Sequence, residues 1–111
     1  MKIPTMLPKL TGTEKQIAWA ETIRDAMIKY IDAEDVKAGL MNHCIGKPAR
    51  MKALGEWVEK NGRISNVWIE SMVERTIWDI RNSPWFINNR FDRQALHCLV
   101  MEMIERELGI E

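Results

Sequence analysis

Two His-Cys dipeptides are the residues in this chain whose types could bind a metal. They are His43-Cys44 and His97-Cys98. Two histidines and two cysteines can together hold zinc tetrahedrally, but paired zinc ligands usually stand two to four residues apart. Adjacent residues on a helix point about 100° apart, so one dipeptide is poorly placed to supply two ligands. We therefore expect no metal site and no cofactor.

Carboxylates are plentiful, but their spacing does not form a catalytic arrangement. Glu14, Glu21 and Asp25 lie along one predicted helix at spacings typical of a solvated surface. The chain contains no glycine-rich phosphate loop, no GxSxG nucleophile elbow and no HExxH metal motif. We therefore expect that the protein is not an enzyme.

Two polar residues fall on the apolar side of the first predicted helix, and they are candidate partner-binding residues. At about 100° per residue, Gln16 and Arg24 lie within its apolar arc. A guanidinium in that position buries its stem and needs a carboxylate or helix-end carbonyls. Two interpretations stay open: the pair braces neighbouring helices, or it lines a groove that receives a partner.

Tryptophan is abundant, with five in 111 residues. Most of these large side chains are expected in the core. Trp78, however, lies away from the main apolar face of its predicted helix. It either packs against Trp85 or is exposed as a contact anchor, because tryptophan and arginine are enriched at binding hot spots.

The segment 83–90 combines aromatic, amide and basic groups in a short connection. Aromatic rings beside Arg90 could stack on unpaired bases. Alternatively, Trp85 plugs the core while the amides of Asn88 and Asn89 cap chain ends. Trp85 and Arg90 are accordingly candidate contact residues under either interpretation of the partner.

Charge is uneven along the chain although its net value is zero, with sixteen basic and sixteen acidic residues. A dedicated nucleic-acid binder usually has a basic excess, so a protein partner is favoured. The segment 43–63 nevertheless offers a modest basic patch against Glu56 and Glu59, and it is the basis of an alternative nucleic-acid-binding function. Its basic residues are Lys47, Arg50, Lys52, Lys60 and Arg63.

Hydrophobic residues make up 46% and charged residues 29% of the chain, which indicates a globular domain. The two cysteines form no CxxC motif, and no apolar run approaches the roughly 20 residues of a membrane span. We expect a cytoplasmic protein without a membrane association.

Helical spacing of apolar residues predicts an all-α protein of about four or five helices. Residues 1–10 are expected to form an extended arm and residues 11–111 a single helical domain. Either Thr11 with Glu14 or Thr13 with Gln16 is suited to open the first helix as a capping box. Asp92 is expected to cap the last. The predicted helices cover about 11–31, 33–45, 48–61, 65–81 and 92–109, with a short turn or helix at 83–89.

The stretch LTGTEKQIAWAETIR at 10–24, together with WFINNR at 85–90, resembles a group of small bacterial and phage or mobile-element proteins. The resemblance covers about one fifth of the chain. In the second motif Asn88 stands where an acid is expected. If that acid pairs with the arginine of the first motif, Arg24 needs another carboxylate here.

The resemblance implies a phage or mobile-element origin and no particular activity. Small proteins of such elements often bind and block host machinery, which is an association rather than a physical argument. The sequence as a whole predicts a non-enzymatic protein that binds a macromolecule. A host protein, for example a defence or DNA-metabolism factor, is the favoured partner, and self-association is possible.

Overall fold

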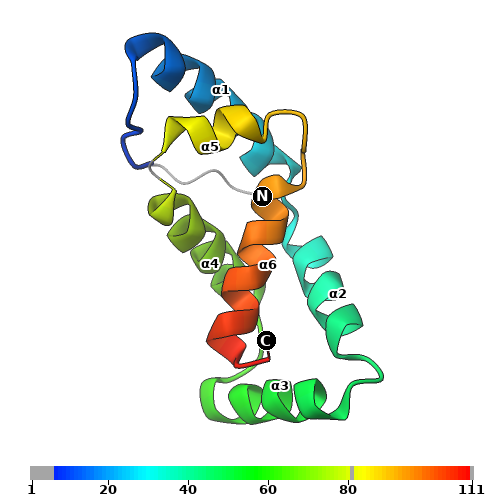
Figure 1. Cartoon of the computed structure of the whole chain (residues 1–111). Helices are drawn as coiled ribbons and strands as arrows, with labels where there is room; N and C mark the ends of the chain where they lie inside the picture. The colour runs from blue at the N-terminus through cyan, green and yellow to red at the C-terminus, as the bar shows by residue number, and fades with distance from the viewer. Residues whose placement is uncertain (1–6, 81, 111) are drawn as a thin grey trace.

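The computed structural model describes residues 7–80 and 82–110, and the regular secondary structure within these ranges is helical (Figure 1). The all-α single domain predicted from the sequence is confirmed. The described residues form six helices rather than four or five, because the segment after Asn82 completes a short helix of its own. The helices are α1 (Glu14–Tyr30), α2 (Ala33–Cys44), α3 (Pro48–Asn61), α4 (Asn66–Asp79), α5 (Ser83–Asn88) and α6 (Ala95–Leu108).

Helix α1 begins with the second of the two possible capping boxes. The Thr13 hydroxyl accepts the Gln16 N–H at 3.2 Å, and the Gln16 side-chain oxygen accepts the Thr13 N–H at 3.0 Å. Gly12 precedes the box at φ 136°, and a Cβ there would lie 2.9 Å from that same Gln16 oxygen. The Gly-Thr-x-x-Gln part of the first motif is therefore explained by its role in starting helix α1.

Several of the other helix ends follow local signals, but the start of α6 does not. Pro48 occupies the first turn of α3, Ser65 accepts the Trp68 N–H at 3.1 Å, and Gly109 ends α6 in the left-handed conformation. Asp92 was expected to cap α6, but that helix begins at Ala95. The Asp92 carboxylate instead accepts the Gln94 N–H at 3.0 Å, in a turn before the helix.

The helices form an elongated body with principal extents of 47 × 25 × 19 Å. Helices α1 and α5 pack together at one end, α3 crosses the other end, and α2, α4 and α6 lie between them (Figure 1). Surfaces on α1 and α3 therefore lie at opposite ends of the molecule.

The core runs the length of this body. Near α1, Leu10 is buried and the Thr11 carbonyl accepts the Ser83 N–H at 3.3 Å, so residues 7–13 tie α1 to the start of α5. The predicted extended arm is non-helical over residues 7–10, and residues 1–6 lie outside the described ranges. The largest fully buried side chains are Phe86, Ile28, Ile31, Leu40, Ile69, Ile77, Leu96, Ile104, Val36, Val73, Val100 and Thr76.

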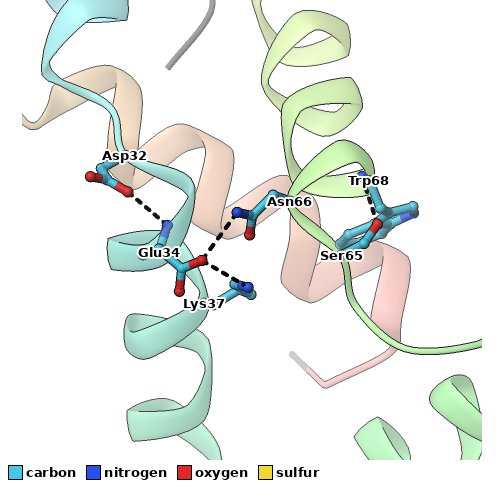
Figure 2. Close-up of polar contacts among 6 residues, drawn as sticks. All are labelled: Asp32, Glu34, Lys37, Ser65, Asn66 and Trp68. Atoms are coloured by element: carbon cyan, nitrogen blue, oxygen red, sulfur yellow. Dashed lines mark hydrogen bonds and ion pairs between the residues drawn. The ribbon is translucent and has the colours of Figure 1, made fainter.

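A polar link joins α2 to α4 at the surface (Figure 2). The Asn66 side-chain N–H donates to Glu34 Oε1 at 3.1 Å, and the Lys37 ammonium lies 3.1 Å from the same oxygen. The hydrogen bond from Asn66, then those from Lys37 and its charge, lower the pKa of Glu34 below its ordinary value.

We expect the free energy of unfolding to decrease at acidic pH because of this link. Because the pKa of Glu34 is lowered by folding, its stabilisation is present above the unfolded pKa and is lost as the pH falls through the folded pKa. The Asn66→Ala variant should raise the folded pKa of Glu34, which an NMR titration of the Glu34 carboxyl measures directly. An unchanged Glu34 titration in this variant would contradict the link.

Candidate functional site

An open groove of about 560 Å³ runs between α1 and the connection from α5 to α6, residues 89–94. Its apolar floor comes from Ile23, Ala26 and Met27 on α1. On α1 this surface borders the buried side of the helix, which includes Ala20 and Met27. A cleft of this size with an apolar floor and a few polar groups is typical of binding sites.

The groove carries positive charge at its rim. Lys29 comes from α1, whereas Arg90 and Arg93 come from the connection. The described residues that line the groove include no carboxylate. Glu14, Glu21 and Asp25 lie more than about 100° around α1 from Tyr30 at the groove, but Asp25 stands one helical turn before Lys29 at the rim.

The Arg90 side chain contacts the two most exposed aromatic rings next to the groove. Its guanidinium carbon lies 5.2 Å from the ring centroid of Trp19 and 4.5 Å from that of Phe91. Its Nη1 also donates to the Ile87 carbonyl at 2.7 Å, which holds the side chain at the end of α5. Trp19 is 49% exposed and Phe91 is 88% exposed. We call Trp19, Arg90 and Phe91 the aromatic–arginine cluster.

Trp19 and Phe91 were not among the residues predicted to bind a partner. Trp19 was assigned to the apolar arc of α1. This arc is wider than the strip of α1 that α5 and α6 bury, so Trp19 stays exposed. Phe91 lies next to Arg90 in the sequence, and an aromatic residue in a turn after a short helix was the one signal that could have identified it.

Arg24 does not line the groove, which corrects the partner-binding interpretation. Its side chain is only 5% exposed, and its Nη1 donates to the Pro8 carbonyl at 2.9 Å. Burial lowers the pKa of Arg24, while the nearby carboxylates of Asp25 and Glu21 act in the opposite direction. The guanidinium therefore braces α1 against the segment before it.

The partner of Arg24 is also different from the one that the motif implied. A carboxylate was expected if the acid missing at Asn88 pairs with this arginine, and helix-end carbonyls were the alternative partner. A backbone carbonyl fills part of that role, and Arg24 Nε is a buried nitrogen without a hydrogen-bond partner among the described residues. Gln16 is likewise occupied, because its side chain closes the α1 capping box.

The two tryptophans predicted to contact a partner do not line the groove. Trp85 is half-buried and packs edge-on against Phe86, with ring centroids 5.1 Å apart. Trp78 is 36% exposed on α4. Of the predicted partner residues, Arg90 is the one that the structure places at the groove.

The two ends of the basic segment 47–63 lie near different parts of α2. Arg50 is half-buried, and its Nη1 donates to the His43 carbonyl at 3.0 Å across the turn between α2 and α3. Lys47 precedes α3 and Arg63 follows it. Arg63 lies beside Lys37 of α2 at a shallow pocket.

The exposed face of α3 mixes both charges. Lys52 and Glu56 stand four residues apart on it, and Glu59 and Lys60 continue the same exposed surface. The predicted basic residues of this segment therefore do not gather into one uninterrupted patch.

The His-Cys dipeptides are also separated by the fold. Cys44 is buried, and this burial raises the pKa of its thiol, whereas Cys98 is exposed. His43 Nδ1 contacts the Glu105 carboxylate and links α2 to α6. Over residues 7–80 and 82–110, no group of three or more His, Cys, Asp or Glu side chains is placed to hold a metal ion.

Comparisons with known proteins do not assign this site: no family model matches the chain, and no curated protein or solved structure is significantly similar to it. Within the described part of the chain, no helix has both the length and the apolar character needed to cross a bilayer.

Proposed function

We propose that this protein binds a protein partner through the aromatic–arginine cluster and the adjoining groove. The observation that carries the proposal is the position of the Arg90 guanidinium over two exposed aromatic rings, Trp19 and Phe91, beside an apolar cleft. Tryptophan and arginine dominate the energetics of protein interfaces, especially where they surround a well-formed pocket.

The proposed partner is a protein of the bacterial host, met in the cytoplasm. The resemblance of residues 10–24 and 85–90 to phage and mobile-element proteins supports a host target. The second motif also supplies Arg90 of the cluster. The zero net charge of the chain and the mixed charges on α3 favour a protein over nucleic acid.

We expect the Trp19→Ala variant to weaken partner capture by about tenfold or more, or about 1.4 kcal/mol. The tagged full-length protein would be incubated with host lysate, and captured proteins would be quantified by mass spectrometry against wild type. Because Trp19 is half-exposed, its truncation should leave the circular dichroism spectrum intact. Val67→Ala, at an exposed apolar position on α4, is the control and should capture as wild type does.

Two other outcomes would contradict this proposal. Capture that survives Trp19→Ala but is lost in Trp78→Ala would move the interface to α4. Recovery of nucleic acid that dissociates steeply with salt, and that depends on Lys52 and Lys60, would favour the basic-segment alternative.

A further inference from the structure

We infer that the groove beside the aromatic–arginine cluster receives an acidic segment of the partner that inserts an apolar side chain. This inference rests on the proposed function and specifies the chemistry that the partner presents. Three features support this inference: the positive charge at the rim, the apolar floor between the charged residues, and the Arg90 guanidinium that covers one face of each aromatic ring.

The rim charge selects an anionic occupant. Lys29, Arg90 and Arg93 approach the groove from both sides, and the described lining residues include no carboxylate. Asp25 stands one helical turn before Lys29 on α1, outside the lining. Asp92 lies between the two arginines in sequence, but its carboxylate accepts the Gln94 N–H in the turn before α6. A segment rich in aspartate and glutamate would be complementary to this rim, which favours the correct partner and penalises a basic one.

The floor requires an apolar group on the same segment. Ile23, Ala26 and Met27 present aliphatic surface at the bottom of the groove. Charge pairs at an exposed rim contribute little affinity by themselves, whereas an apolar anchor in a desolvated pocket contributes much of the binding energy. An acidic segment that carries a leucine or phenylalanine satisfies both parts of the groove.

The cluster is less suited to nucleic acid. Single-stranded nucleic acid binds by stacking successive bases on aromatic faces. Here the Arg90 guanidinium covers a face of Trp19 and a face of Phe91. The groove adds one further exposed ring, that of Tyr30, but its floor is aliphatic. A polypeptide that carries an apolar side chain is therefore the better fit to the floor.

The test uses the full-length protein and a fluorescent synthetic peptide of aspartates and glutamates with a central Leu-Phe pair. Fluorescence anisotropy would compare it with the same peptide carrying Gly-Ser at the centre, with a peptide in which lysine replaces every acid, and with oligothymidylate. We expect the acidic Leu-Phe peptide to bind at least about tenfold more tightly than each of the other probes.

A matched pair of substitutions on α1 locates the binding. Ala26→Glu places a carboxylate on the groove floor and should weaken binding of the acidic Leu-Phe peptide by about tenfold or more. Ala18→Glu introduces the same side chain at another exposed position of the same helix and should change affinity by less than about twofold. Both positions are exposed, so both variants should fold.

The inference is overturned if the acidic Leu-Phe peptide does not bind, if Ala26→Glu binds it as Ala18→Glu does, or if oligothymidylate binds more tightly. These failures are distinguishable from failure of the proposed function. Host-protein capture that depends on Trp19 while the acidic peptide does not bind would retain the protein partner and remove only its acidic character. Peptide binding lost in Ala26→Glu, with host capture insensitive to Trp19→Ala, would retain the groove chemistry and remove the proposed function.

Discussion

The Phe86→Ala variant is expected to lose about 3–5 kcal/mol of unfolding free energy. Phe86 is fully buried in α5, a helix of six residues that packs mainly on α1. So short a helix has little stability of its own, and its position depends on this side chain. Truncation would leave a cavity between α5 and α1 and would also remove the edge-on contact with Trp85.

Chemical denaturation followed by circular dichroism measures this loss, and Phe91→Ala is the matched control. Phe91 lies five residues further along and is 88% exposed, so its truncation should change stability by no more than about 0.5 kcal/mol. Equal effects of the two substitutions would contradict the assignment of Phe86 to the core. Because α5 leads directly into residues 89–94, Phe86→Ala should also disturb the groove.

The Arg24→Ala variant is expected to lose about 2–4 kcal/mol of unfolding free energy. Truncation removes the packed aliphatic stem and leaves the Pro8 carbonyl, which accepts from Arg24 Nη1 at 2.9 Å, without its donor. Arg24→Met keeps most of the stem and removes a desolvated charge whose Nε is unpaired among the described residues. The loss in Arg24→Met should therefore be smaller than in Arg24→Ala.

Thermal and chemical denaturation of the two Arg24 variants test this ranking against Arg93→Ala. Arg93 is exposed at the groove rim, so its removal should leave stability nearly unchanged. An Arg24→Ala protein as stable as wild type, but weaker in partner capture, would restore Arg24 to the binding surface and refute the bracing role.

Local sequence signals predicted the helices well because their causes are local. Thr13 and Gln16 cap α1, Pro48 begins α3, and Gly109 ends α6 through interactions within a few residues of each helix end. The apolar periodicity of each segment likewise predicted an all-α domain. The short α5 was only partly anticipated, because six residues carry too little periodicity to separate a helix from a turn.

The candidate site was predicted less well because its parts are far apart in sequence. Arg90 was identified from its neighbours, but its position over Trp19 depends on the packing of α5 against α1. A helical wheel places Trp19 on the apolar side and cannot say how wide a strip the neighbouring helices cover. The same limit applies to Arg24, whose partner is the backbone of Pro8 rather than a side chain that a motif could reveal.

The sequence by itself determined the fold class and most helix boundaries, since capping and periodicity act over a few residues. It also singled out Arg24 and Arg90 as polar side chains that need a partner. Only the tertiary structure decided that Arg24 is buried while Arg90 lies over Trp19 on an exposed face beside the groove. The physical reason is that burial depends on which helices meet. In this protein α5 covers one flank of α1 and leaves the other open to a partner.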